Sequence, residues 1–459
     1  MSFLRVWQGT PNQKYWVWAL SLLSLLLYVY TAYALERSQF TQYLITYTCL
    51  FISFILLYKS SISWQYLLIT GIAFRVSFLL AIPNLSQDFY RFIWDGNLNL
   101  EAISPYQVTV LQAFEGLGNL PVLFLENAQD LLQGMGNLNA SHFSNYPPVS
   151  QFVFALAASF QKFNIVGNLI GYRIVLLVAD LGILFLGKKL LVFLDRDPRA
   201  LFLYFLNPFI IIELTGNVHF EGLMIFFMLA ALFVLYKNRW LWSAVLWGIA
   251  IAVKLIPLIG LPMFLKYFIS QKHGTYKLFI FYIIILAVFT LSFIPYISPQ
   301  FIAHFGESVG LWFSKFEFNA SLYYMVRWIG FQTVGWNIIA SAAKVLAVIV
   351  CVSTLILSLY KRRQLPSVIE GLMWALCIYL TAATTVHPWY LATPLLLSVF
   401  TNYRFVVVWS FTIFFSYHAY RFPTVNENPY WLLAEYGIVG LYLCYEFWWK
   451  RPLKTVDTH

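Results

Sequence analysis

Long apolar runs recur along the whole chain, and they limit its fold more than any other feature of the sequence. Residues 15–35, 41–58 and 278–296 are three examples. An α-helix needs about 20 apolar residues to cross the hydrocarbon core of a bilayer, and these runs are close to that length. Hydrophobic residues make up 61% of the chain and charged residues only 10%, which excludes a soluble domain. The sequence therefore predicts an all-α polytopic membrane protein with roughly 12 to 14 spans, folded as one domain over residues 1–459.

Membrane anchoring explains the positive charge of the chain. The formal net charge is +10, but many Lys and Arg residues lie in short clusters beside apolar runs, such as 188–189 and 361–363. Such clusters are typical of the cytoplasmic ends of spans. We therefore expect membrane lipids, and no nucleic acid, among the partners; the oligomeric state does not follow from the sequence. The four cysteines lie in apolar segments without paired spacing, which indicates neither disulfides nor metal ligation.

The basic clusters also distinguish the two sides of the membrane. Counting spans from a cytoplasmic N-terminus puts two long loops, residues 83–148 and 297–334, outside the cytoplasm. In the first loop, the apolar pieces at 107–114 and 121–133 are too short to cross, and we expect interfacial helices there. The short apolar segment at 148–160 is expected to stay at the outer face as well.

One stretch of the first loop concentrates charge. Residues 86–96 read SQDFYRFIWDG and follow directly on an apolar segment of span length. In a helix, steps of three and four residues put Asp88, Arg91 and Asp95 on one face. In a chain with so few charges, this charged stripe outside the bilayer is a candidate site.

Other polar residues fall on the same side of the membrane. Two apolar halves, 240–253 and 255–265, have basic outer flanks, and they predict a helical hairpin with Lys254 at its far end. The remaining candidates lie in outer loops or at outer span ends, and they are Tyr146, His219, Glu221, Asn319, Arg327, His387 and Arg421. An outward-facing cavity with carboxylates, histidines and cations is the simplest interpretation.

These motifs resemble those of the GT-C superfamily of membrane glycosyltransferases. Residues 88–96 match Asp-x-Tyr/Phe-Arg-x-x-Trp-Asp-Gly, and Ser-Pro-Tyr follows at 104–106. The nearest resemblance is to the catalytic subunit of GPI mannosyltransferase I and to bacterial polyprenol-phosphate-mannose-dependent mannosyltransferases. Further similar islands follow in the same order, at 146–148, 206–208, 216–217, 254–257, 318–323 and 388–390. The eukaryotic subunit begins this loop with Asp-x-Asp, whereas Ser86 stands first here; a divalent cation is the only cofactor that we consider.

The resemblance implies a GT-C-like bundle and a reaction. A sugar, mannose in these relatives, would pass from a polyprenyl-phosphate donor to a hydroxyl of a lipid or glycan acceptor, with inversion. A positioned carboxylate would act as general base, and we choose Asp88. Cations would stabilise the departing phosphate, and the candidates are Lys254, Arg327, His387 and Arg421. We expect a multi-pass protein of a bacterial inner membrane, with its site facing the periplasm or the exterior.

Several of these residues have structural alternatives that the sequence leaves open. Asp88 could cap the helix that follows it, and Asp95 could be a turn residue or the partner of Arg91. Lys254 could extend to the membrane interface, and His387 could cap a span.

Two further pairs are equally open. His219 and Glu221 share one loop and could contribute to a metal site, although two residues are too few for one. Arg173 and Asp180, seven residues apart within one apolar run, could act as proton-relay groups or could be structural, paired with each other or with other partners.

A transporter or flippase of a lipid-linked sugar is the alternative from a different class of protein. That class predicts repeat-related halves, paired broken helices and polar groups near the bilayer midplane. The chain has one broken element, around Lys254, and its polar groups gather on one side. The sequence therefore favours the transferase.

Overall fold

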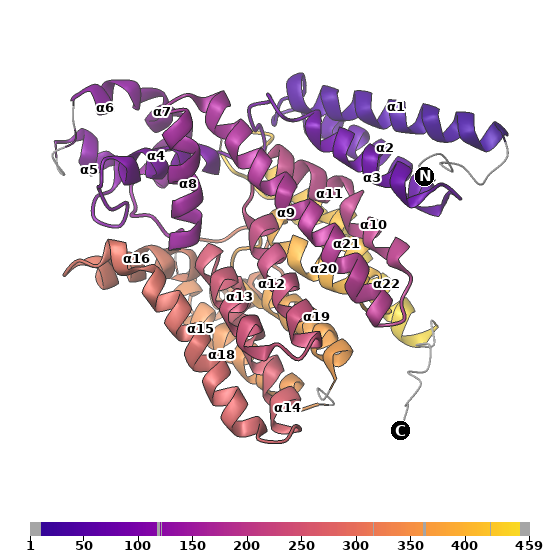
Figure 1. Ribbon diagram of the computed structural model, residues 1–459. Coiled ribbons are helices and arrows are strands. Elements are labelled where there is room, and N and C mark those ends of the chain that lie inside the picture. The colour runs from indigo at the N-terminus through magenta and orange to yellow at the C-terminus, as the bar shows by residue number, and fades with distance from the viewer. Residues whose placement is uncertain are drawn as a thin grey trace.

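Helices form most of this computed structural model, and the helices of residues 88–140 gather at one end of the molecule, at the upper left of Figure 1. The structure describes residues 11–116, 120, 122–314, 316–360, 364–422 and 424–449. Among these residues, strand-like pairing is confined to isolated bridge positions, such as the bridge between Phe318 and Thr385. The predicted all-α class is confirmed.

Six of the described helices are long and apolar enough to cross a bilayer. They are α1 (Pro11–Tyr33), α2 (Phe40–Lys59), α9 (Ile165–Phe193), α15 (Gly274–Ser292) continued by η4 (Ile294–Tyr296), α18 (Ile339–Leu359) and α19 (Leu365–Ala382). The number is lower than the roughly 12 to 14 spans expected from hydropathy, because several expected spans are bent or short.

The span expected at 200–215 is a bent pair of helices. Its first half consists of η1 (Pro198–Leu201) and α10 (Phe202–Phe205), and its second half consists of α11 (Pro208–Ile210) and η2 (Ile211–Gly216). The chain bends by 49° between the two halves. Pro208 has no amide hydrogen with which to continue the first half. The side chain of Asn207 accepts the Phe209 amide at 3.0 Å and starts the second half.

Other apolar segments form shorter helices. They are α3 (Trp64–Val76), α8 (Pro148–Phe160), α12 (Glu221–Tyr236), α13 (Trp240–Val253), η3 (Ile256–Met263), α14 (Phe264–Ile269), η5 (Pro388–Leu391), α20 (Ala392–Val399), α21 (Phe405–Thr412) and η6 (Ile413–Tyr420), and the longer α22 (Pro429–Trp448) ends the described chain. As expected, α13 and η3 are the two halves of a hairpin with Lys254 between them.

Both long loops contain helices. Those of the first loop are α4 (Asp88–Leu100), α5 (Val110–Phe114), α6 (Val122–Asn127) and α7 (Gln129–Ala140), and those of the second are α16 (Phe301–Ser314) and α17 (Leu322–Thr333). α4 packs so closely against α8 that a Cβ atom at Gly96 would lie only 2.5 Å from the Phe154 carbonyl oxygen. Glycine at the end of the Trp-Asp-Gly sequence is thus required by this contact.

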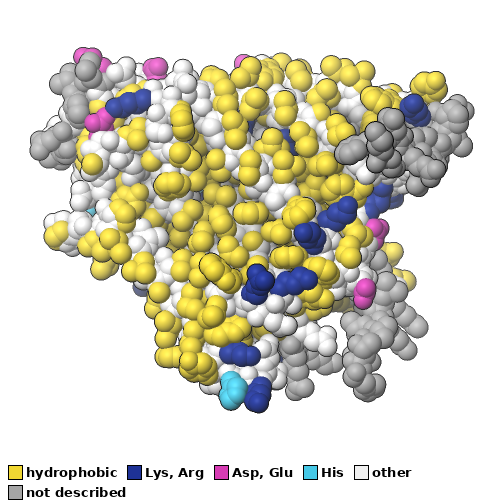
Figure 2. Space-filling model, viewed as in Figure 1, with side chains coloured by type: hydrophobic (Ala, Val, Ile, Leu, Met, Phe, Trp, Pro, Cys, Tyr) yellow, Lys and Arg dark blue, Asp and Glu magenta, His cyan; other side chains and the backbone are white. Residues whose placement is uncertain are grey.

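The surface is as apolar as the composition requires. Figure 2 shows hydrophobic side chains over most of the visible face, and most of its Lys and Arg side chains lie towards the lower right, away from α4–α7. An exposed apolar surface of this extent suits contact with lipid. The chain is a multi-pass membrane protein.

Two buried arginines fix the position at which the chain enters α4. Arg75 of α3 pairs with Asp180 of α9, with 2.7 Å between Nε and Oδ2, and both side chains are at most 2% exposed. The guanidinium of Arg173 donates to four backbone carbonyls, those of Leu79, Ala81, Thr215 and Gly216. Arg173 and Asp180 therefore have separate structural partners.

We predict that Asp180→Asn lowers the stability of the protein by about 3 to 5 kcal/mol, because it leaves the Arg75 charge buried without its partner. The measurement is the midpoint of thermal unfolding in detergent, followed by tryptophan fluorescence. The exposed carboxylate of Asp130 provides a matched control, and Asp130→Asn should change stability by less than about 0.5 kcal/mol. The double variant Arg75→Met/Asp180→Leu should recover most of the loss; equal midpoints for all variants would contradict the structural role.

Candidate functional site

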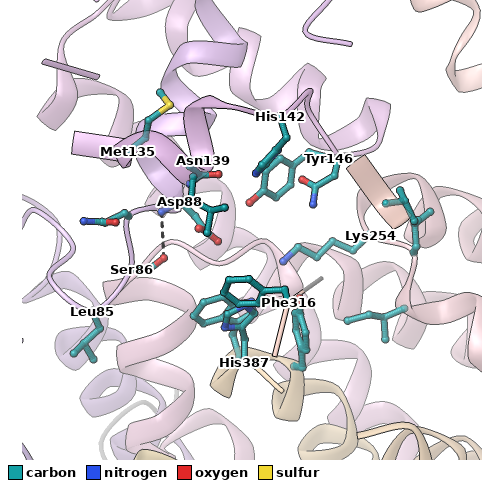
Figure 3. A pocket seen from close by; sticks show the side chains of 18 of the residues that line it. Leu85, Ser86, Asp88, Met135, Asn139, His142, Tyr146, Lys254, Phe316 and His387 are labelled. Carbon is teal, nitrogen blue, oxygen red and sulfur yellow. Dashed lines mark hydrogen bonds between the residues drawn. The ribbon is translucent and has the colours of Figure 1, made fainter. Parts of the chain in front are cut away.

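A cavity of about 330 Å³ lies where the start of α4 meets the tip of the α13–η3 hairpin and the loop between α19 and η5 (Figure 3). The side chains with polar groups that line it are Arg37, Ser86, Gln87, Asp88, Asn139, His142, Asn145, Tyr146, Lys254, Tyr379, His387, Trp389, Tyr390 and Tyr420. Of the residues expected from the sequence, the cavity brings together Asp88, Tyr146, Lys254 and His387.

Asp88 is the first residue of α4 and lies half-buried in the cavity wall. The Ser86 hydroxyl accepts the Asp88 amide at 3.2 Å, so a neighbouring side chain contributes to the start of the helix. The Asp88 carboxylate points into the cavity, towards the side on which Tyr146 and Lys254 lie (Figure 3). A negative charge in the first turn is also favoured by the helix dipole.

The surroundings of Asp88 act on its ionisation in opposite directions. Burial raises the pKa of the Asp88 carboxyl above its ordinary value. The positive charge of Lys254 and a hydrogen bond from Tyr146 partly offset this rise. A carboxyl group held in this way is a better proton acceptor than an ordinary surface aspartate once it is ionised.

Lys254 enters the cavity from the hairpin tip. The chain leaves α13 in an extended conformation at Lys254, with φ −150° and ψ 148°. Its ammonium pairs with the carboxylate of Glu221, whose side chain is fully buried at the start of α12. The same ammonium lies 6.0 Å from the ring centre of Tyr146 and 5.9 Å from that of Tyr390. Lys254 is therefore held inside the protein by a counter-ion and aromatic rings.

Arg91 and Asp95 lie on one face of α4, as the spacing predicted, but behind the cavity wall. Their ion pair has 2.7 Å between Nε and Oδ1, and both side chains are at most 1% exposed. Arg91 also donates to the carbonyls of Asn139 and His142, while Asp95 accepts from Ser144 and Gln151. Of the two alternatives for Asp95, the structure contains the Arg91 partner, and together the pair joins α4 to the segment that carries Tyr146.

A stack of rings supports one wall of the cavity. Trp389 lies between His387, at 4.6 Å from ring centre to ring centre, and His219, at 3.7 Å. Burial and the charge of Lys254 lower the pKa of His387 to about 3, so its imidazole is neutral at ordinary pH. His219 is buried behind Trp389, with its Nε2 3.8 Å from a carboxylate oxygen of Glu213.

Like Arg91, Asp95, His219 and Glu221, three more expected residues do not line the cavity. Asn319 is fully buried; its backbone amide donates to Glu427 and its side-chain amide donates to Glu435. Arg327 pairs with Glu317. Arg421 is exposed and its guanidinium lies 5.8 Å from the Phe422 ring centre.

Arg37 and Tyr420 are among the cavity residues that were not expected from the sequence. Arg37 belongs to the short turn between α1 and α2, and its guanidinium lies 4.7 Å from the ring centre of Tyr420. The span count that put the 83–148 loop outside also puts this turn outside, so sidedness was the signal that could have identified Arg37.

The cavity does not suit a divalent cation. It combines the single carboxylate of Asp88 with the cation of Lys254, whereas Mg²⁺ and Ca²⁺ take several oxygen ligands. Within the described part of the chain, no three His, Cys, Asp or Glu side chains come together as a metal site.

An apolar groove of about 400 Å³ continues from the cavity. η3 forms one of its sides, and α18 and α19 form the other. The residues that line both the groove and the cavity are Leu255, Ile256, Val309, Tyr379 and Tyr390. The Lys254 ammonium lies 5.9 Å from the ring centre of Tyr390, which lines both, so the cation lies near the junction between polar cavity and apolar groove.

Comparison with known proteins identifies related sequences. The family model described as "Alpha-(1->6)-mannopyranosyltransferase, N-terminal domain" matches residues 10–270, which include Asp88 and Lys254 but not His387. Alpha-(1->6)-mannopyranosyltransferase A of Mycobacterium tuberculosis is 24% identical over 351 residues, which are 71% of this chain and 63% of that protein. Alpha-(1->6)-mannopyranosyltransferase B of Corynebacterium glutamicum is 26% identical over 211 residues, which are 44% of this chain and 33% of that protein. The matches thus cover less than two thirds of either relative.

Proposed function

The chain belongs to the alpha-(1->6)-mannopyranosyltransferase family, and from this premise we propose that it transfers mannose from a polyprenyl-phosphate donor to an acceptor hydroxyl. The continuity of a polar cavity with an apolar groove at Lys254 is the observation that carries the proposal. A polyprenyl-phosphate sugar has the same division, because its sugar and phosphate are polar and its tail is hydrocarbon. The proposed donor lies with its phosphate at Lys254, its tail in the groove and its mannose beside Asp88.

The reaction follows from this arrangement. Asp88 takes the proton of the acceptor hydroxyl as the hydroxyl oxygen forms a bond to the anomeric carbon. The bond from that carbon to the phosphate oxygen breaks, and polyprenyl phosphate leaves with the electron pair. One carboxylate serves a single displacement, so the configuration at the anomeric carbon inverts.

Protein groups stabilise the phosphate as it leaves. Negative charge grows on the leaving oxygen, and a fixed cation in a partly dry cavity lowers the energy of that state. Lys254 supplies the cation, and Glu221 keeps its charge balanced before the donor binds. Neutral His387 can donate a hydrogen bond to the same phosphate without adding charge.

We also propose that the cavity faces the periplasm or exterior of a bacterial inner membrane. The basic clusters at the opposite ends of the spans support this orientation.

Replacing Asp88 by Asn should lower transfer by about 100-fold or more, because the amide cannot accept the proton of the hydroxyl. The measurement is transfer of labelled mannose from polyprenyl-phosphate mannose by detergent-solubilised protein. Asp130→Asn, which alters an exposed carboxylate of α7, should retain the wild-type rate. Turnover by Asp88→Asn at the wild-type rate would exclude the base assignment. If the wild type transfers no sugar but moves a mannosyl phospholipid across liposomes, the protein is a transporter.

The pH dependence of the rate reports on Asp88 as well. The base works when ionised, so kcat/KM is lost as pH falls through its pKa; since burial raises that pKa, the loss begins at a higher pH than for an ordinary aspartate. In Lys254→Met the offsetting charge is gone, so the acid limb of the profile should move to still higher pH. Lys162→Met removes a half-exposed lysine that does not line the cavity and should leave the limb unmoved. An acid limb that is identical in all three proteins would contradict the assignment.

The orientation can be tested by cysteine labelling. In a variant without the native cysteines, Gln87→Cys puts a thiol at the cavity rim, and Lys59→Cys puts one at the end of α2. Both positions are exposed. A membrane-impermeant maleimide should label Gln87→Cys in intact spheroplasts and Lys59→Cys only after lysis. The reverse labelling pattern would show that the cavity faces the cytoplasm and would contradict the proposed orientation.

A further inference from the structure

A second groove, lined by α3 and α9, is separate from the site described above. It has a volume of about 460 Å³, and Trp64 and Leu68 of α3 line it together with residues between Leu181 and Phe193 of α9. Most of these residues are apolar, and Lys188 and Lys189 are the two with a charge. The residues that line it differ from those of the cavity and of the groove at η3. We call it the α3–α9 groove.

The position of the lysines along α9 puts them at the edge of the hydrocarbon core. Residue 179 is the middle of α9, and Lys188 follows nine residues later, about 14 Å along the axis at 1.5 Å per residue. Half of the hydrocarbon core of a bilayer is about 15 Å thick. Leu181, which also lines the groove, is about 10 Å nearer the middle of the helix than Lys188. The groove thus leads from headgroup depth into the hydrocarbon.

The lysines are at the end of α9 that is far from the cavity. The other half of α9 carries Arg173, which donates to the carbonyls of Leu79 and Ala81 in the segment that leads to α4. The side chain of Asn84, in the same segment, donates to the carbonyl of Leu35 just beyond α1. The first of the two lysines follows Arg173 by fifteen residues, about 22 Å along the axis. With the orientation proposed above, the α3–α9 groove opens into the cytoplasmic leaflet.

Both lysines are held at the groove without a carboxylate partner. The Lys188 ammonium lies 4.2 Å from the ring centre of Trp64, and the Lys189 ammonium lies 4.0 Å from that of Phe185. The ion pairs between described residues include neither lysine, and both side chains are exposed. Two positive charges are therefore available to an anion.

Three other charged residues at this end of α9 have partners within the protein. Arg196 donates to the side chain of Asn402 at 3.1 Å, and Arg199 donates to the carbonyl of Tyr58. Asp197 accepts the backbone amide of Arg199 at 2.8 Å. Anchoring of a span accounts for the basic cluster as a whole. It does not account for a groove that leads from two unpaired lysines into the apolar part of the same helix.

We propose that the α3–α9 groove binds a phospholipid with an anionic headgroup. Lys188 and Lys189 bind its phosphate at headgroup depth, and one acyl chain lies along Leu181 and Leu184. A soluble anion would leave the apolar length of the groove empty, and a lipid without net charge would leave the two ammonium groups without a counter-charge. This inference does not depend on the reaction proposed above.

A lipid in this position links the two helices that form the groove. α3 and α9 are already joined by the buried ion pair of Arg75 and Asp180, and Asp180 directly precedes Leu181 at the inner end of the groove. The lipid adds contacts between the same helices nearer the membrane surface. It should therefore stabilise the folded protein, as any ligand of the folded state does.

The test is native mass spectrometry of the full-length protein in detergent, titrated with phosphatidylglycerol or with phosphatidylcholine that has the same acyl chains. The wild type should bind phosphatidylglycerol about ten- to thirtyfold more tightly. Lys188→Met/Lys189→Met should remove this preference, while Arg196 and Arg199 remain to orient α9. Equal affinity of the wild type for the two lipids would overturn the inference.

A matched double variant separates the groove from general surface charge. Lys272→Met/Lys277→Met removes the same charge before and within the first turn of α15, and neither residue lines the α3–α9 groove. The preference for phosphatidylglycerol should persist in this variant. An equal loss of preference in both double variants would contradict a site in the groove.

The apolar half of the groove is tested without a change of charge. Leu181→Trp should fill it and weaken the binding of phosphatidylglycerol about tenfold, although both lysines remain. Val178→Trp, three residues earlier on an exposed part of α9 outside the groove, should bind as the wild type does. Unchanged binding by Leu181→Trp would exclude the acyl chain from the groove.

Two further measurements complete the test. Glycerol phosphate, which has the anionic group without acyl chains, should not displace the lipid, and displacement at equal concentration would make the groove a simple anion site. Phosphatidylglycerol should raise the midpoint of thermal unfolding of the wild type but not that of Lys188→Met/Lys189→Met. A rise of the same size in both proteins would contradict the proposal.

Discussion

Burying charge in an apolar interior is costly, and the arrangement of the molecule depends on how that cost is met. Arg75 with Asp180, Arg91 with Asp95 and Lys254 with Glu221 each join segments or turns that carry the cavity. A buried ion is tolerated where a partner of opposite charge or several hydrogen bonds offset the loss of its hydration. The Arg75–Asp180 pair therefore holds α3 against α9, and the Lys254–Glu221 pair holds the hairpin tip against α12. The Arg91–Asp95 pair joins successive turns of α4, and Arg91 also bonds to the segment after α7.

The same requirement shapes the cavity itself. Its polar side is enclosed by residues from the first loop and from the turn between α1 and α2, while its apolar side opens between η3, α18 and α19. Lys254 is at the boundary because α13 must end before Pro257, and the extended residue between the two halves points its side chain inward. The lipid-linked donor that we propose would need both environments side by side, and the break between α13 and η3 lies where the cavity and the groove meet.

Local sequence patterns predicted features within a single helix or hairpin. The i, i+4 spacing predicted the shared face of Arg91 and Asp95, and basic flanks predicted the hairpin around Lys254. Such patterns could not predict contacts between segments that are distant in the sequence. Nothing near Asn319 indicates that Glu435, far along the chain, would accept from its side chain, and nothing near Arg37 indicates that it would line the same cavity as Asp88. Hydropathy also counted more spans than there are long helices, because an apolar run looks alike whether it is straight or, as at Pro208, bent.

Asn84 has a consequence for the way in which the bilayer acts on the protein. Its side-chain nitrogen donates to the carbonyls of Thr31 in α1 and of Leu35 just beyond it, and its side-chain oxygen Oδ1 accepts from the hydroxyl of Tyr43 in α2 at 2.8 Å. A helix pair of this kind changes its tilt when the hydrocarbon thickness changes. A change in the tilt of α1 and α2 would therefore act through Asn84 on the segment that leads to Asp88 and α4.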